Sequence, residues 1–147
     1  MTSIPLVAAA AAVLKIVLLP PGLLVEATSR EAEWLDEKLR RELAERAELV
    51  PLASVAKALS EQGVDDPAAC DDACLVEIGR ALGADRAVRQ TLSMQKKMQS
   101  HGTVWQWAVH QVDIAKAAPF GHFEQMCMCP TSAWDTIARK HAERLVA

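Results

Sequence analysis

The sequence lacks the short motifs that usually mark a catalytic or a phosphate-binding site. No serine stands in a G-x-S-x-G context, and the stretch "GRALGAD" has no Lys-Ser or Lys-Thr after it. That stretch also closes an expected helix, whereas a phosphate site needs the beginning of one. We therefore expect neither an enzyme nor a bound cofactor.

Long apolar runs and strong net charge are missing as well. Lys15 divides the apolar N-terminal part, and Pro20, Pro21 and Gly22 interrupt the stretch after it, so no run of about eighteen apolar residues remains for a transmembrane helix. The formal net charge is only −3, and basic residues alternate with acidic ones. This distribution gives no broad electrostatic reason to bind nucleic acid or anionic lipid. We expect no transmembrane span, no nucleic-acid partner and no small-molecule substrate.

What is present fits one domain of ordinary size. The 147 residues are 51% hydrophobic and 24% charged, which is enough to bury a core without obligatory cross-links. Residues 1–14 stand apart, because an apolar run from Ile4 to Leu14 comes after a short start that has no Lys or Arg. We interpret 1–14 as a signal segment for export or as an N-terminal arm of the mature protein, and 15–147 as a single domain.

The first half of this domain alternates between apolar runs and helical patterns. The stretch "KIVLLPPGLL" predicts a buried strand that ends at Pro-Pro-Gly. A helix comes next, because Thr28 and Glu31 have the spacing of a capping box. Leu35, Leu39 and Leu43 then fall on one face of that helix.

The same helix carries three acid-before-base pairs at a spacing of four residues, which predicts ion pairs on its surface. We interpret them as a solvated outer face, with a charged binding surface as the alternative. The pairs are Asp36–Arg40, Glu37–Arg41 and Glu42–Arg46.

Two shorter helices and a short strand complete this half. "AELVPLA" predicts an edge strand or a strand end, because of its internal proline. Ser54 is the expected cap of a second helix that stops at Gly63. The acidic pair Asp71-Asp72 suits the positive end of a third helix, which Gly83 ends.

The second half changes to the alternation typical of strands with one wet face. From Val88, apolar residues predict one face of a strand (Val88, Leu92, Met94, Met98) and polar residues the other (Arg89, Thr91, Ser93, Gln95, Lys97). "TVWQWAVHQVDI" predicts a second strand, and "HFEQMCMC" a third that Pro130 closes. Ser132 and Asp135 then begin a final helix with an apolar stripe, made of Trp134, Ile137, Ala138, His141 and Leu145.

The resulting order is β-α-β-α-α-β-β-β-α, with no linker long enough to divide it. It predicts one α/β domain built on a mixed sheet, with the helices mainly on one face of that sheet.

The four cysteines are candidates for disulfides of undetermined connectivity. They stand as C-x3-C (Cys70, Cys74) and C-x-C (Cys127, Cys129), and neither spacing suits a zinc knuckle or a C-x-x-C redox pair. An even count in two clusters favours two disulfides, within the clusters or between them, and hence an oxidising compartment. Zinc ligation, redox chemistry and buried reduced thiols are the alternatives.

Other polar and aromatic residues carry weaker hypotheses. His110 and His122 fit opposite positions on adjacent strands, where two imidazoles can ligate a metal, but no third ligand stands at a supporting spacing, so partly exposed sheet histidines are favoured. Asp65-Asp66 and Asp71-Asp72 lack the alternating ligands of a calcium loop. Trp105 and Trp107 share a strand face. We interpret them as covering a helix, with stacking on a ligand as the alternative. No metal site is predicted.

The combination of a strand ending in "LLPP", the helix "WLDEKLRRELAERAELVPL" and "AACDDACLVEIGRALGADRAVRQTL" resembles small extracytoplasmic bacterial domains. These are similar to the amino-terminal domain of TolB and the periplasmic domain of CsgG. The resemblance covers residues 15–147 and includes an "LGAD-x-x-V-x-x-x-L" segment between helix and strand, here Leu82, Gly83, Ala84, Asp85, Val88 and Leu92.

The resemblance implies a non-enzymatic periplasmic or cell-envelope module that binds protein partners or itself. It assigns no functional residues. Two alternatives remain: a structural subunit of a filament or cytoplasmic assembly that keeps its apolar N-terminus, and a metal-binding protein that uses Cys and His.

Overall fold

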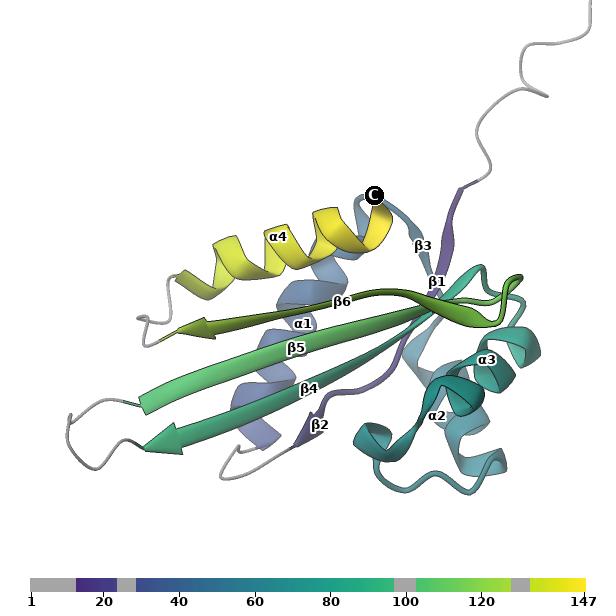
Figure 1. The fold of residues 1–147 in the computed structure, drawn as a ribbon, viewed down its shortest axis with the longest axis horizontal. Coiled ribbons are helices and arrows are strands. Elements are labelled where there is room, and N and C mark those ends of the chain that lie inside the picture. The colour runs from purple at the N-terminus through teal and green to yellow at the C-terminus, as the bar shows by residue number, and fades with distance from the viewer. Residues whose placement is uncertain (1–12, 24–28, 97–102, 128–132) are drawn as a thin grey trace, which may run out of the picture.

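A computed structural model describes residues 13–23, 29–96, 103–127 and 133–147. Within these ranges the chain forms one mixed sheet, four α-helices and a short 3₁₀ helix (Figure 1). The strands are β1 (Lys15–Leu18), β2 (Gly22–Leu23), β3 (Glu48–Leu49), β4 (Arg86–Lys96), β5 (Thr103–Asp113) and β6 (Ala118–Cys127). The helices are α1 (Ser29–Ala44), α2 (Leu52–Glu61), η2 (Pro67–Ala69), α3 (Asp72–Ala81) and α4 (Ala133–Val146).

The sheet has the order β3-β1-β4-β5-β6, and β2 pairs with β4 beyond the end of β1. β1 is parallel to β3 and β4, whereas β5 is antiparallel to both β4 and β6. The predicted mixed sheet and element order are therefore confirmed, with one addition. The expected first strand is divided into β1 and β2 because Pro20 and Pro21 have no N–H groups to continue the ladder.

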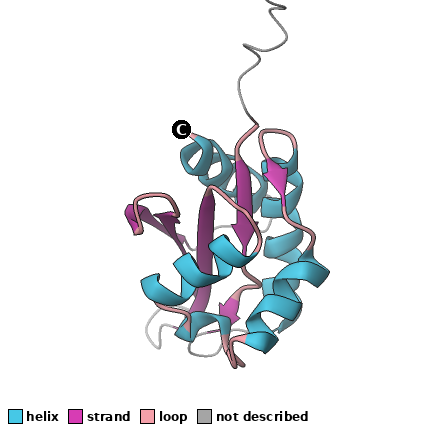
Figure 2. Ribbon diagram, turned by 90° about the vertical axis from the view of Figure 1, so that its right-hand side faces the viewer, coloured by secondary structure: helices cyan, strands magenta, loops and turns pink. Residues whose placement is uncertain are grey.

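Helices cover both faces of the sheet, so the prediction that they lie mainly on one face is wrong (Figure 2). Ile16 and Leu18 contact the core that contains α1 and α4, whereas Val17 and Leu19 contact the core that contains α2 and α3. All four side chains are fully buried. A central strand that is apolar at every position needs cover on both sides, since successive side chains point to opposite faces.

The larger core confirms the predicted apolar faces of two helices. Leu35, Leu39 and Leu43 of α1 are buried. So are all five residues of the stripe predicted on α4, namely Trp134, Ile137, Ala138, His141 and Leu145. Thr28 and Ser132, the expected caps of these two helices, lie outside the described residues.

Helix ends follow proline and glycine. α2 begins at Leu52 with Pro51 as its N-cap, so the predicted cap at Ser54 is wrong. The fixed φ of Pro51 favours a helix start at this point, and the Ser54 N–H already donates to the Pro51 carbonyl. Gly63 and Gly83 have φ of 70° and 65° and end α2 and α3 as predicted.

The antiparallel strands show the expected alternation. Val88 and Leu92 are buried, and Arg89, Thr91 and Ser93 lie on the opposite, partly exposed face. The side chain of Met94 and the whole of Met98 lie outside the described residues.

β6 begins at Ala118, four residues before the predicted start at His122. Pro119 is tolerated there because β6 is an edge strand, where one row of N–H groups is not needed for the ladder. A register shift at Gln111 and Val112 accompanies this part of the pairing.

No helix in the described ranges is both long and apolar enough to span a bilayer.

Candidate functional site

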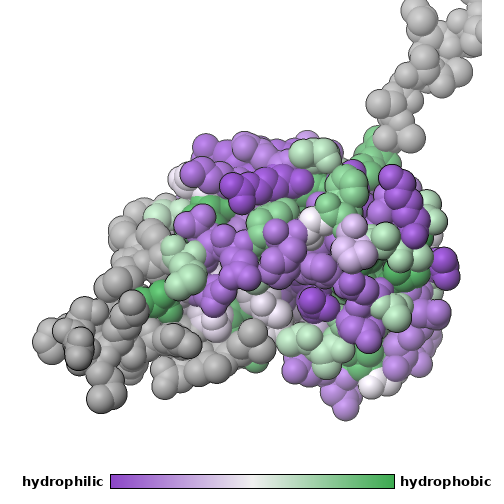
Figure 3. All heavy atoms as spheres, in the orientation of Figure 1, coloured by the Kyte–Doolittle hydropathy of each residue, from purple (hydrophilic) through white to green (hydrophobic). Residues whose placement is uncertain are grey.

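The part of the sheet that α2 and α3 leave uncovered carries mostly polar side chains. We define the open face as the uncovered side chains of β4–β6 that point away from α1 and α4 in the described part of the chain, namely Arg89, Thr91, Ser93, Val104, Gln106, Ala108, His110, His122, Glu124 and Met126. All are partly or largely exposed. Hydrophilic side chains predominate over these strands in Figure 3. The open face therefore presents hydrogen-bonding groups on a rigid support.

A cavity of about 260 Å³ lies where the open face meets η2 and the start of α3. Its lining residues are Ala68, Ala69, Asp71, Arg89, Thr91, Ala108, His110 and His122. Gly22 lets η2 come close to the sheet here, because a Cβ atom at residue 22 would lie 2.5 Å from the Cβ atom of Ala68.

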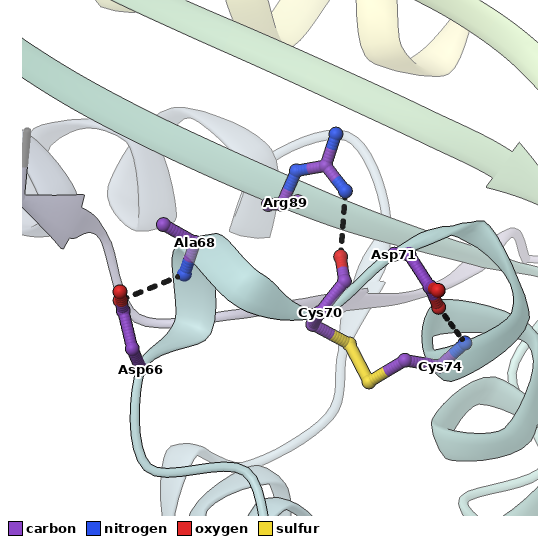
Figure 4. The surroundings of a disulfide bond; sticks show 6 residues. All are labelled: Asp66, Ala68, Cys70, Asp71, Cys74 and Arg89. Atoms are coloured by element: carbon purple, nitrogen blue, oxygen red, sulfur yellow. Dashed lines mark hydrogen bonds between the residues drawn. A yellow bond between two sulfur atoms is a disulfide. The ribbon is translucent and has the colours of Figure 1, made fainter.

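A disulfide joins Cys70 and Cys74, which stand on either side of the cavity-lining Asp71 in the sequence (Figure 4). The two Cα atoms are 5.2 Å apart, and Cys70 is fully buried. Asp71 caps α3 by accepting a hydrogen bond from the Cys74 N–H at 2.9 Å. Arg89 Nη1 donates to the Cys70 carbonyl at 2.6 Å, so a residue of the open face is attached directly to the disulfide loop.

The disulfide selects one of the pairings that the spacing left open for Cys70 and Cys74. With both sulfur atoms in one covalent bond, neither serves as a thiolate ligand in this structure. Cys127 ends β6, but its side chain and the whole of Cys129 lie outside the described residues. A second disulfide at Cys127 and Cys129 stays a prediction.

His110 and His122 occupy directly opposite positions on β5 and β6, which confirms the expected cross-strand placement. Their Nδ1 atoms are 3.3 Å apart. His110 Nε2 lies 2.7 Å from a carboxylate oxygen of Asp72, and His122 Nε2 lies 3.1 Å from one of Glu124. The four side chains thus form a continuous carboxylate–imidazole–imidazole–carboxylate chain across the open face. His101 lies outside the described residues.

Glu124 is held in its ionised form by its neighbours. Its pKa is lowered, first by the hydrogen bond from His122 and then by the hydrogen bond from the Gln106 amide. A hydrogen bond to a carboxylate stabilises the charged form. The outer end of the chain of four side chains is therefore an acceptor at neutral pH.

The acidic residues near the first cysteines serve local structure. Asp66 accepts from the Ala68 N–H at 3.0 Å and begins η2, while Asp71 begins α3. Asp72 alone reaches another element, through His110. No pattern in the sequence indicated that contact, since it depends on how α3 packs against β5.

Trp105 and Trp107 cover a helix, as the favoured interpretation expected. Their ring centroids lie 6.2 and 6.1 Å from that of Trp134 on α4. His141 of α4 packs edge-on against Trp107 at 4.8 Å and is 2% exposed. Burial, followed by the nearby charge of Arg144, lowers the pKa of His141 to about 4. These rings belong to the core and leave no aromatic platform for a ligand at Trp107.

A buried polar network crosses the same core and was missed from the sequence. Trp107 Nε1 donates to the Gln90 side-chain oxygen at 3.1 Å, and Gln90 Nε2 donates to Asp36 at 2.5 Å. Arg40 Nε donates to the other Asp36 oxygen at 2.8 Å, and its Nη2 donates to the Leu18 carbonyl at 2.8 Å. One of the three predicted ion pairs is thus buried rather than part of a solvated face. The one indication of this network in the sequence is Gln90, a polar residue that falls on the apolar face of β4 between Val88 and Leu92.

Comparison with solved structures places this fold among known bacterial proteins. The C-terminal domain of LpoB from Salmonella enterica matches with a TM-score of 0.58 and 14% identity over 80% of this chain and 84% of that one. Lipoprotein GNA1162 from Neisseria meningitidis matches with a TM-score of 0.62 and 11% identity, covering 90% and 97%. The PelC dodecamer from Paraburkholderia phytofirmans matches with a TM-score of 0.53 and 12% identity, covering 91% and 86%.

At these identities the likeness establishes a shared fold that spans nearly the whole of this chain. No family model and no curated protein sequence matches the chain. The resemblance to TolB and CsgG domains, which rests on the sequence alone, stays a prediction.

Proposed function

We propose that this protein is a non-enzymatic module of a bacterial cell envelope, exported from the cytoplasm, that acts by binding protein partners or further copies of itself. The observation that carries the proposal is the whole-domain likeness to lipoprotein GNA1162 and to PelC. The first is named as a lipoprotein, a class of membrane-attached proteins, and the second as a dodecamer.

The disulfide supports the location outside the cytoplasm. Cys70–Cys74 closes a short loop whose geometry is fixed by the Asp71 cap and by Arg89. Disulfides of this structural kind persist in the periplasm and are rare in the reducing cytoplasm.

The open face and the adjoining β6 edge are the proposed contact surface. Among the strands in the described part of the chain, β6 pairs only with β5, so its outer backbone groups are proposed to be available to another chain. Met126, near the end of β6, is 61% exposed and gives this surface an apolar anchor beside polar groups.

Intact mass spectrometry of the protein from the cells that make it tests the location. Without reductant we expect at most two alkylated thiols, since Cys70 and Cys74 are paired. After denaturation and reduction we expect four. Alkylation of all four thiols without reduction would remove the argument for an oxidising compartment.

The same spectrum reports the N-terminus. A mass that shows cleavage near residues 10–14 fits export through a signal. An intact Met1 together with four free thiols favours the competing class, a structural subunit of a filament or a cytoplasmic assembly.

Self-association is tested with a matched pair of surface variants. We expect Met126→Glu to raise the dissociation constant of self-association at least tenfold, because it places a charge on the open face. Native mass spectrometry and light scattering over a range of protein concentrations measure this constant. Leu52→Glu is the control, since Leu52 is 45% exposed on α2, outside β4–β6. Equal assembly of both variants and the parent would reject this surface as the contact between copies, and pull-down with the parent then tests a different protein partner.

A further inference from the structure

We propose that His110 and His122, which both line the cavity on the open face, form a binding site for a divalent transition-metal ion such as Zn²⁺ or Cu²⁺, bound through the two Nδ1 atoms. The site goes beyond the proposed interaction role and does not depend on it.

The separation of the two nitrogen atoms fits a shared metal ion. Imidazole nitrogens bind zinc at about 2.0–2.1 Å, so two of them at a tetrahedral angle lie about 3.3–3.4 Å apart. His110 Nδ1 and His122 Nδ1 are 3.3 Å apart. The two nitrogen atoms are therefore already as far apart as a shared ion requires, and rotation of the rings would turn their lone pairs toward it.

The outer ring nitrogens are already oriented as they are in metal sites. Asp72 faces His110 Nε2 and Glu124 faces His122 Nε2, so each carboxylate accepts a hydrogen bond from an Nε2–H group. This tautomer leaves the Nδ1 lone pairs for coordination.

The four side chains of this arrangement are held in place by the secondary structure and by one further hydrogen bond. His110 and His122 are held by the β5–β6 ladder, and Asp72 lies in the first turn of α3, next to the disulfide. Glu124 also accepts a hydrogen bond from Gln106. The rings are therefore positioned before any ion arrives, which reduces the ordering cost of binding.

The ligand set indicates the kind of ion. Two neutral imidazoles suit Cu²⁺, Ni²⁺ and Zn²⁺, whereas Mg²⁺ and Ca²⁺ prefer oxygen ligands. Nowhere in the described ranges do three or more His, Cys, Asp or Glu side chains gather as direct ligands. The remaining coordination positions accordingly belong to water, and the cavity lined by Thr91 and Ala108 has room for it.

Titration calorimetry on the tag-free full-length chain tests the site with CuCl₂, NiCl₂ and ZnCl₂ in a non-chelating buffer, with MgCl₂ as a negative control. We expect one ion per chain, with Cu²⁺ bound more tightly than Zn²⁺. His110→Ala and His122→Ala should each weaken binding at least tenfold. His101→Ala, which removes a histidine that is not a proposed ligand, should leave it unchanged.

Further variants separate coordination by imidazole from trivial causes. Asp72→Asn and Glu124→Gln should each weaken binding about 10- to 100-fold if they orient the rings. In Cys127→Ser/Cys129→Ser, binding must persist, since the thiols are not the proposed ligands. Near-ultraviolet circular dichroism of the tryptophans checks that each variant is folded.

The proposal is overturned by any of three results: no binding of Cu²⁺ or Zn²⁺ below millimolar concentration, binding that survives in both histidine variants, or binding lost with the two cysteines. Electron paramagnetic resonance of the Cu²⁺ complex should show two coordinated imidazole nitrogens. None of these results bears on export or assembly, so failure here is distinguishable from failure of the proposed function.

Discussion

Asp36→Ala is expected to lower the free energy of unfolding by about 3 kcal/mol, whereas Glu37→Ala, one residue further along the same helix, should change it by less than about 0.5 kcal/mol. Both residues form an ion pair with an arginine four residues later. The two carboxylates differ by one methylene group but greatly in their surroundings, so the two variants form a useful comparison.

The difference comes from what each substitution leaves behind. The side chains of Asp36 and Arg40 are 12% and 16% exposed, against 71% and 69% for Glu37 and Arg41. Loss of Asp36 removes the acceptor for both Arg40 and Gln90, and buried donors without partners are costly. Loss of Glu37 removes one screened surface contact.

Urea unfolding followed by tryptophan fluorescence measures both variants. Asp36→Asn is a useful third variant, because it keeps an oxygen for Gln90 while removing the charge that balances Arg40. Equal midpoints for Asp36→Ala and Glu37→Ala would show that the network through Gln90 and Trp107 contributes no more than a surface pair.

Lowering the pH from about 6.5 to about 4 is expected to remove about 3 kcal/mol of stability through His141 alone. The folded protein keeps this imidazole neutral, because burial lowers its pKa to about 4 from 6.5. Between these two values the unfolded chain binds a proton that the folded chain does not. The contribution is therefore complete above pH 6.5 and is lost progressively as the pH falls toward 4.

The variant His141→Leu isolates this effect, since leucine fills part of the apolar space between Trp107 and Phe123 and cannot titrate. Thermal or urea unfolding should be measured at several pH values from about 4 to about 7.5 for both proteins. We expect the parent to lose stability more steeply than the variant by about 3 kcal/mol over that range. Parallel curves would mean that His141 is protonated at little cost in the folded state.

The sequence predicted local structure well wherever one periodic pattern decided it. The apolar face of α1, the alternation along β4 and the glycine stops of α2 and α3 are all confirmed. Each depends on side chains a few residues apart, whose relative placement the element itself fixes.

Features that depend on packing between distant elements were not predictable in the same way. Asp36 and Arg40 have the spacing of an ordinary surface pair, and only the approach of α1 to β4 places them beside Gln90. The contact between Asp72 and His110 likewise joins α3 to β5 across 38 residues. The spacing of residues within one helix or strand does not predict such contacts between distant elements.

The presence of helices on both faces of the sheet could have been predicted from the sequence. "KIVLL" is apolar at every position after its lysine, which is typical of a strand covered on both sides. The wet face of β4 and β5 suggested one-sided cover because it shows alternation. Both patterns are correct, since α3 covers the end of the sheet near Ala87 and Val112 and leaves the rest of the strands open.

The central place of β1 also determines the order in which the sheet is completed. β1 begins at Lys15, yet one of its two neighbours, β4, begins at Arg86. A chain that leaves the ribosome amino-terminal end first can pack β1 against β3, α1, α2 and α3 before β4 is made, but β1 then still lacks its second neighbouring strand. Closure then requires a contact between segments about seventy residues apart, and such distant pairings slow folding. A chain exported as proposed here would gain time to cross the membrane unfolded, and its disulfide would form only afterwards.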